Sequence, residues 1–186
     1  MVIKVENENY KNKKDVFNVI SYVINPDRKD LMGSGLIGFP LNQNIENIQN
    51  AVWKNKLYYK KITGRNIRHM IISLSDEEMQ YFGVEDLRNL GYYVATKIYN
   101  GFMTIFGIHC PNGGNLHIHL VLDTVNFFTG LKFQESPQQL KKHSEMIKKF
   151  LGSLLPNGFY YNENFNINNG ETEYVLQNSI DLEDLL

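Results

Sequence analysis

Residues 101–122 read GFMTIFGIHCPNGGNLHIHLVL, and the fold that the sequence predicts is built around them. Two apolar and β-branched segments, Gly101–His109 and Leu116–Leu122, are separated by residues 110–115, which begin with Cys-Pro-Asn-Gly-Gly. Proline, asparagine and glycine are typical of tight turns, and strands joined by such a short turn pair antiparallel. The stretch therefore predicts a β-hairpin.

Three of the five histidines of the chain lie on this hairpin. Side chains alternate between the two faces of a strand, so His117 and His119 project from one face and their leucine and isoleucine neighbours from the other. His109 ends the first strand, and the hairpin brings it beside them. Three neutral nitrogen donors around one point suit a divalent ion that also binds substrate oxygens. A single histidine in a strand is more often structural, but three on one face favour a metal site, and the spacing alone leaves a zinc hydrolase, an oxygenase and a nuclease open.

Helix and strand signals on both sides of the hairpin complete the predicted fold. In chain order they are a strand at 1–5, a helix that Asp15 caps and Pro26 stops, a loop at 27–42, a short helix at 45–53, a central strand at 67–74, a helix whose apolar stripe runs from 87 to 98, and a helix from 136 to 152. The Asn-rich stretch 157–170 shows no sustained period. This order predicts an antiparallel sheet with helices on one face, the α+β class.

Length and composition bound the architecture. With 186 residues, of which 42% are hydrophobic, the chain can bury one solid core but not two large ones. We expect a compact domain over residues 1–155 and a partly ordered, Asn-rich and acidic C-terminal extension over 156–186. No apolar run approaches the roughly 18 residues that cross a bilayer, no signal-peptide pattern is present, and the single cysteine, Cys110, excludes an internal disulfide. These features predict a cytoplasmic protein without membrane insertion.

The net charge of −1 argues mildly against a nucleic-acid partner, but it conceals an asymmetry. All 19 lysine and arginine residues precede position 170, whereas five of the 20 acidic residues follow it. The body of the chain is therefore cationic. The acidic end is either a solvated tail or a segment that docks on the body or masks it.

Four segments together resemble a known family. Residues 109–123, HCPNGGNLHIHLVLD, resemble the three-histidine motif of plasmid mobilisation relaxases of the MobA/VirD type (MOBP-like), part of the HUH endonucleases, with residues 117–119 as the HUH element. In the same chain order, ISYVINPDRK at 20–29 resembles the motif with the nucleophilic tyrosine, RHMIISL at 68–74 the middle strand motif, and VNFFTGLKF at 125–133 the segment after the histidines. The resemblance spans residues 16 to about 150.

The resemblance implies a two-layer, ferredoxin-like sandwich around an antiparallel sheet of about five strands. It implies that Tyr22 attacks a phosphate of single-stranded DNA at the transfer origin of a plasmid or integrative element, giving a phosphotyrosyl intermediate that is later rejoined. His109, His117 and His119 would hold Mn²⁺ or Mg²⁺, and Ser73 would contact DNA near the nick. The implied partners are accessory mobilisation (relaxosome) proteins and a coupling protein.

The implied chemistry is coherent from the residues themselves. A phenol is a weak nucleophile at neutral pH because little of it is ionised, so Tyr22 needs a cation or a base nearby. A metal ion also stabilises charge that builds up on a phosphate. Tyr58 and Tyr59 are the alternative nucleophiles, and they lie in a basic, aromatic stretch suited to single-stranded DNA. The side chains expected to bind DNA there are Lys60, Lys61, Arg65 and Arg68.

Two positions depart from the family pattern. Pro111 stands where members commonly carry an acidic residue, and Asp123 stands where they carry asparagine. Asp123 shares the histidine face of its strand, so we expect its carboxylate to orient a metal ligand by a hydrogen bond.

Three other functions stay open at this stage. A rolling-circle replication initiator uses the same site chemistry, but it usually places its tyrosine after the histidines, whereas Tyr22 precedes them. A small-molecule metallohydrolase would need a deep pocket and would not depend on Tyr22. A non-catalytic DNA-binding accessory protein on the same fold, which Pro111 and the weak net charge favour, would bind metal without cutting DNA.

Overall fold

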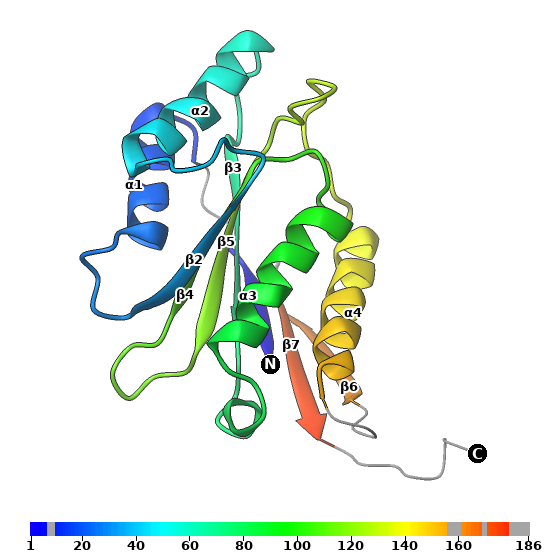
Figure 1. The fold of residues 1–186 in the computed structure, drawn as a ribbon. Coiled ribbons are helices and arrows are strands. Elements are labelled where there is room, and N and C mark those ends of the chain that lie inside the picture. Colours follow the sequence, from blue (N-terminus) through cyan, green and yellow to red (C-terminus); the bar gives the residue numbers. More distant parts are fainter. Residues whose placement is uncertain (7–9, 156–160, 169–170, 179–186) are drawn as a thin grey trace.

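A five-stranded antiparallel sheet forms the centre of the protein (Figure 1). The computed structural model describes residues 1–6, 10–155, 161–168 and 171–178. In chain order the elements are β1 (Val2–Val5), α1 (Lys13–Ile24), β2 (Leu31–Ile37), α2 (Ile45–Tyr58), β3 (Ile67–Ser73), a 3₁₀ turn (Glu78–Gln80), α3 (Val84–Tyr93), a π-helical turn (Val94–Ile98), β4 (Thr104–His109), β5 (His117–Asp123), α4 (Pro137–Ser153), β6 (Tyr161–Asn168) and β7 (Glu171–Asn178). The strand order β1-β3-β5-β4-β2 places β5 in the middle with its hairpin partner β4 beside it. The predicted α+β class, hairpin and five-stranded sheet are confirmed.

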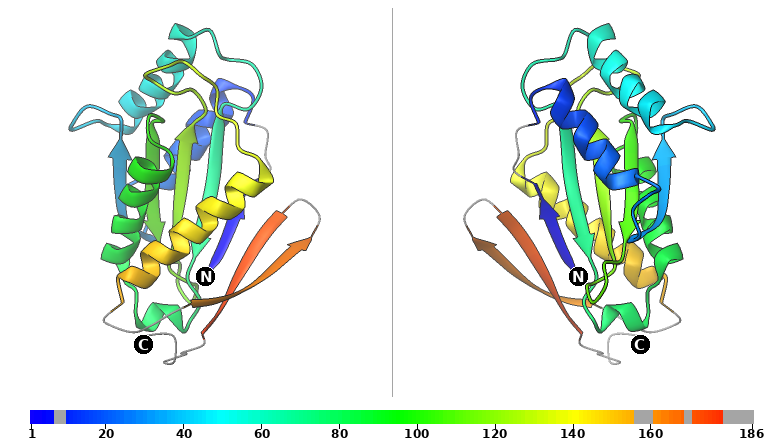
Figure 2. Two further views of the ribbon diagram at one scale, coloured as in Figure 1. Left: turned by 90° about the vertical axis from the view of Figure 1, so that its right-hand side faces the viewer. Right: turned by 90° about the vertical axis from the view of Figure 1, so that its left-hand side faces the viewer.

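The helices cover both faces of the sheet, with α1 and α2 on one face and α3 and α4 on the other (Figure 2). This differs from the prediction of helices on one face and of a two-layer sandwich. The central strands are apolar on both sides: Met70 and Ile72 point into one core cluster, whereas Ile67 and Val121 point into the other. A sheet with two apolar faces needs a cover on each.

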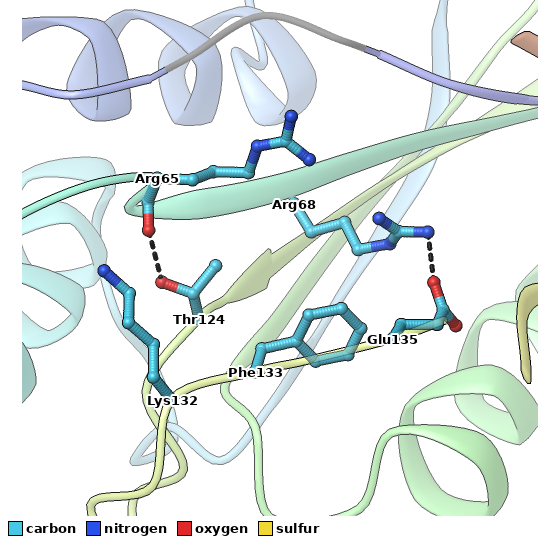
Figure 3. Close-up of a pocket in the computed structure, with 6 residues that line it drawn as sticks. All are labelled: Arg65, Arg68, Thr124, Lys132, Phe133 and Glu135. Carbon is cyan, nitrogen blue, oxygen red and sulfur yellow. Dashed lines mark hydrogen bonds and ion pairs between the residues drawn. The ribbon is translucent and has the colours of Figure 1, made fainter. Parts of the chain in front are cut away.

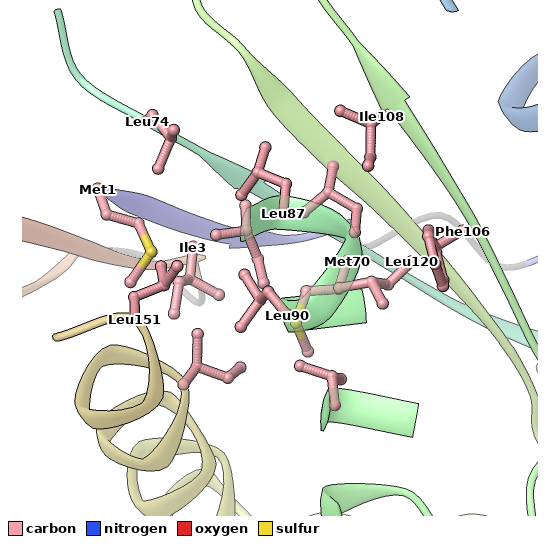
Figure 4. Packing of buried hydrophobic residues seen from close by; sticks show 14 of the residues in the cluster. Met1, Ile3, Met70, Leu74, Leu87, Leu90, Phe106, Ile108, Leu120 and Leu151 are labelled. Carbon is pink, nitrogen blue, oxygen red and sulfur yellow. The ribbon is translucent and has the colours of Figure 1, made fainter. Parts of the chain in front are cut away.

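The larger core lies between the sheet and helices α3 and α4 (Figure 4). Ile118 and Leu120 of β5 point into it, as the period of two predicted. Leu90 of α3 and Leu151 of α4 pack against them from the helical side and are almost completely buried. Each such side chain contributes on the order of 1.5–3 kcal/mol of hydrophobic stabilisation, so this layer holds the hairpin rigidly in place.

Helix α1 begins earlier than the sequence predicted. Its N-cap is Asn12, whose side chain accepts a hydrogen bond from the backbone nitrogen of Asp15 at 2.9 Å. Asp15, predicted as the cap, lies instead in the first turn, where its charge interacts favourably with the helix dipole. The helix ends at Ile24, directly before Asn25 and Pro26, as predicted.

Strand β2 was not predicted from the sequence, because a loop was expected over residues 27–42. Its glycines suggested a turn, but Gly35 serves the packing of β2 against a side chain of β4. A Cβ atom on Gly35 would lie 2.2 Å from Cζ of Phe106, so only glycine leaves room for that ring. α2 also extends further than predicted, to Tyr58, whereas α4 has the predicted capping box of Ser136 and Gln139.

The C-terminal stretch that showed no periodicity contains part of an antiparallel hairpin, β6 and β7, and β7 lies beside β1. The acidic residues at 181, 183 and 184 lie outside the described residues. Among the described residues, no helix is both long and apolar enough to cross a membrane.

Candidate active site

The three histidines of the hairpin gather on the face that α1 covers. His109 ends β4 and is the direct cross-strand partner of His117, and His119 follows on the same side of β5. One ring nitrogen from each lies within 4.8 Å of the other two. The ring of His119 lies 4.9 Å from that of His109 and 5.0 Å from that of His117. The structure thus brings together the three side chains that the sequence proposed as metal ligands.

Two of these rings are fixed by backbone carbonyl groups. His109 Nε2 lies 2.9 Å from the carbonyl oxygen of Val23 in α1, and His117 Nδ1 lies 2.8 Å from that of Asn115. A carbonyl oxygen only accepts hydrogen bonds, so these nitrogens carry the protons when the rings are neutral. The lone pair is then left on Nδ1 of His109 and on Nε2 of His117.

The third ring is held by a buried chain of side chains. His119 Nδ1 lies 2.9 Å from Nε2 of His69 in β3, and His69 Nδ1 lies 3.1 Å from the hydroxyl of Tyr10. All three residues are buried. The chain fixes the orientation of His119, and its Nε2 points away from His69.

The ring nitrogens not used in these bonds are suited to a cation. Among the described residues, the buried atoms His109 Nδ1 and His119 Nε2 have no hydrogen-bond partner. A carboxylate oxygen of Asp30 lies 3.5 Å from His109 Nδ1, too far for a hydrogen bond. Burial lowers the pKa of His109, and burial together with the neighbouring histidines lowers that of His119 to about 2. Imidazoles with free lone pairs, whose ring nitrogens lie within 4.8 Å of one another, fit a divalent metal ion.

Tyr22 lies directly against this cluster, in the last turn of α1. Its ring centroid lies 5.8 Å from that of His109 and 5.4 Å from that of His119. The side chain is 45% exposed, so a substrate can reach it from the open side. Glycine at position 107 permits this approach of α1 to β4, because a Cβ atom there would lie 1.9 Å from the carbonyl oxygen of Val23.

Arg28 holds a positive charge over the Tyr22 ring, with its guanidinium carbon 4.2 Å from the ring centroid. Asp30 binds the guanidinium through both oxygens, at 2.9 and 2.5 Å, and Arg28 in turn holds the pKa of Asp30 at about 2. The backbone nitrogen of Cys110 donates to the carbonyl oxygen of Asp30 at 2.8 Å, which fastens this loop to the end of β4.

Sequence reasoning missed Arg28, Asp30 and His69 as parts of this site. Arg28 and His69 stand inside segments that matched the family motifs, but no spacing rule connects them to residues 109–119. Tyr10 and His69 are 59 residues apart, and His69 and His119 are 50 apart. Only the pairing of β3 with β5 and the path of the loop after α1 bring them to the histidines.

Ser73 is placed near the cluster and Asp123 is not. Ser73 ends β3 as the cross-strand partner of His117. Asp123 lies at the other end of β5, where it forms a fully buried ion pair with Lys56 and accepts a hydrogen bond from Asn55 at 2.7 Å. The prediction that Asp123 orients a metal ligand is therefore wrong, because the strand carries it too far from the histidines.

The four basic residues predicted to bind DNA also lie at the far end of the sheet. Lys60 and Lys61 are exposed, and Arg65 is half-buried. Arg68 is buried and forms an ion pair with Glu135, so its charge is already compensated.

The alternative nucleophiles lie at that end as well. Tyr59 donates a hydrogen bond to the carbonyl oxygen of Phe127 at 2.9 Å, and its ring contacts that of Tyr58. Neither has a ring contact with the histidines among the described residues, whereas Tyr22 contacts two of them.

The five-stranded α+β fold and the histidine cluster together define a domain with a candidate metal site. The family model described as "Relaxase: MobA/VirD2-like, nuclease domain" matches residues 22–151, so the chain belongs to this family. A chain solved in work on the molecular basis of vancomycin resistance transfer in Staphylococcus aureus has a similar fold, with a TM-score of 0.53 and 15% sequence identity over 82% of this chain and 90% of that one. Comparison with curated proteins gives no match.

Proposed function

We propose that this relaxase domain nicks one strand of DNA at a transfer origin, with Tyr22 as the nucleophile, and remains covalently attached to the cut end until the strand is rejoined. The observation that carries this proposal is the contact of a half-exposed Tyr22 ring with both His109 and His119. The position of Tyr22 before the histidines in the chain favours a relaxase over a rolling-circle initiator.

Each residue of the site has its own role in the proposed cleavage reaction. The Tyr22 oxygen attacks the phosphorus atom, and the oxygen of the adjoining nucleotide leaves as a hydroxyl group. The guanidinium of Arg28 lies over the Tyr22 ring, next to the proposed nucleophile, and Asp30 fixes that guanidinium in place. His109, His117 and His119 would hold Mn²⁺ or Mg²⁺, which would stabilise negative charge on the phosphate oxygens.

The remaining contacts and partners follow from the same proposal. Ser73, beside His117, would bind the backbone next to the nick, and the cations Lys60, Lys61 and Arg65 would bind DNA further away. We propose residues 1–155 as the nuclease domain and 156–186 as an extension. Accessory mobilisation proteins and a coupling protein would act with it in the cytoplasm.

The test is incubation of the purified protein with Mn²⁺ and single-stranded oligonucleotides that tile a candidate origin, followed by a denaturing gel. We expect a protein-linked DNA band that disappears with Tyr22→Phe, with His117→Ala and with EDTA, and that persists with Tyr58→Phe. Cutting that survives Tyr22→Phe would point to a metallohydrolase, and metal binding without cutting of any strand would point to an accessory protein.

A further inference from the structure

A basic pocket of about 250 Å³ lies at the end of the sheet opposite the histidines (Figure 3). Its lining residues come from the loop before β3, from β3 itself and from the segment after β5: Arg65, Arg68, Thr124, Lys132, Phe133 and Glu135. Thr124 directly follows β5 and His117 begins it, so the pocket and the histidines are separated by the length of this strand, roughly 20 Å.

One of the three cations belongs to the framework of the pocket. Arg68 forms an ion pair with Glu135, and its guanidinium lies over the Phe133 ring, 5.3 Å from the centroid. Glu135 also accepts hydrogen bonds from the Tyr99 hydroxyl at 2.9 Å and from His143 Nδ1 at 2.6 Å. The negative charge of Glu135 is therefore compensated within this network and does not repel an anion in the pocket.

The other two cations are left for a ligand. Arg65 has no ion-pair partner among the residues that the structure describes. Lys132 donates a hydrogen bond to the carbonyl oxygen of Thr63, which is a neutral partner. Burial lowers the pKa of Lys132, and the charge of Asp123 opposes this shift. Asp123 already forms an ion pair with Lys56, so an anion in the pocket would further stabilise the charged form of Lys132. Two cations that form no ion pair among the described residues line one cavity, and this favours an anionic ligand.

Exposed aromatic side chains lie on the chain segments that lead into the pocket-lining residues. Phe128 is 71% exposed and Tyr58 is 79% exposed, and both lie on segments that the Tyr59–Phe127 hydrogen bond joins. Cations together with exposed aromatic rings are the combination by which proteins hold the phosphates and stack the bases of single-stranded nucleic acid. An isolated phosphate ion would not use the aromatic rings.

We propose that this pocket binds a phosphodiester group of the DNA strand that the histidine site acts on, and that Arg65 and Lys132 hold this phosphate. The inference rests on the proposed function, since it takes the same DNA as the ligand. The pocket lies about 20 Å from the nick, so only a strand that extends well beyond the cut site reaches both places. The pocket would thus be a second DNA contact, separate from the histidine site.

The test compares two fluorescently labelled single-stranded oligonucleotides, one covering the nick site alone and one extended on both sides. The variant is Arg65→Gln with Lys132→Gln, and the matched control is Lys142→Gln with Lys149→Gln, two exposed lysines of α4 that remove the same charge. We expect the wild type and the control to bind the extended strand more tightly than the short one. The pocket variant should lose about tenfold in affinity for the extended strand, and its slope of log K against log salt should fall by about 0.7 for each lost phosphate contact.

The outcomes separate the two proposals. If the wild type cuts and binds DNA but the pocket variant matches the control in affinity and salt slope, the pocket assignment is wrong and the relaxase proposal stands. If the wild type neither binds nor cuts any strand, both fail together. Equal melting temperatures of the pocket variant and the control exclude misfolding. A protein with the single change Lys132→Arg keeps the positive charge and should bind the extended strand like the wild type. Binding of inorganic phosphate at Arg65 and Lys132 in NMR titrations, with no dependence of DNA affinity on strand length, would assign the pocket to a small anion instead.

Discussion

At the scale of single residues, the site depends on which nitrogen of each histidine carries a proton. Two arrangements satisfy the chain from Tyr10 through His69 to His119. In one, His119 donates to His69 and His69 donates to Tyr10, which leaves a lone pair on His119 Nε2. In the other, every bond is reversed and His119 Nε2 carries a proton, which excludes a metal ion. Metal binding therefore selects the first arrangement, in which His69 acts as the acceptor that orients His119.

Replacing His69 should weaken metal binding without removing a ligand. For His69→Ala we expect a 10- to 100-fold loss of Mn²⁺ affinity, on the order of what the loss of such an orienting hydrogen bond costs. Isothermal titration calorimetry on the apo-protein measures it, and His143→Ala, which removes a histidine bound to Glu135, is the control. Unchanged affinity in a folded His69→Ala protein would show that this chain does not position His119.

The same scale shows what could be read from the sequence. The period of two on one strand was enough to place His117 and His119 together, because that rule is local. Arg28 and Asp30 could not be placed, since their contact with Tyr22 and His109 depends on how the loop after α1 is fastened to β4.

At the scale of elements, the contact of α1 with β4 brings the proposed nucleophile to the histidines that we propose as metal ligands. The carbonyl oxygen of Val23 binds His109, and Tyr22 stands next to it in the same helical turn. This contact needs a residue without a side chain at position 107. The sequence predicted the helix and the strand, but it could not predict that α1 lies over the histidines. Gly35 of β2 was mistaken for a turn signal because its packing partner Phe106 is distant in the chain.

Substituting alanine at position 107 should therefore damage the site as well as the fold. Gly107→Ala places a methyl group against the Val23 carbonyl, so we expect a loss of about 1–3 kcal/mol in the free energy of unfolding together with weaker Mn²⁺ binding and slower cutting. Gly35→Ala is the comparison, because it clashes with the Phe106 side chain and should destabilise by a similar amount while Mn²⁺ affinity is retained. Urea unfolding and calorimetry measure both quantities, and equal metal affinities in the two variants would refute this role of the contact.

At the scale of the whole molecule, the two proposed sites lie at opposite ends of the sheet. The histidine cluster lies at the end where the hairpin turn joins β4 to β5, and the basic pocket lies at the C-terminal end of β5. The core between them is built on both faces of the sheet, and His69 is buried, so its protonation is coupled to folding.

The stability of the metal-free protein should fall on acidification. Burial lowers the pKa of His69 to about 4, below the ordinary value near 6.5 that it regains on unfolding. Below about pH 6.5 the unfolded chain therefore binds a proton that the folded protein does not, so the free energy of unfolding decreases as the pH falls. From pH 6.5 to 4 this amounts to on the order of 3 kcal/mol for His69 alone. Urea unfolding in EDTA across this range should show a shallower pH dependence for His69→Gln than for the wild type, and identical slopes would contradict the assignment.

The central claim is that Tyr22 forms the covalent bond to DNA. The most direct measurement is mass spectrometry of the DNA-linked protein after nuclease trimming and trypsin digestion, because the peptide spanning 15–28 contains Tyr22 as its only tyrosine. We predict a nucleotide remnant on this peptide, at Tyr22, formed only when divalent metal is present. A remnant on the peptide 57–60, which carries Tyr58 and Tyr59, or cut DNA without any modified tyrosine, would contradict the account.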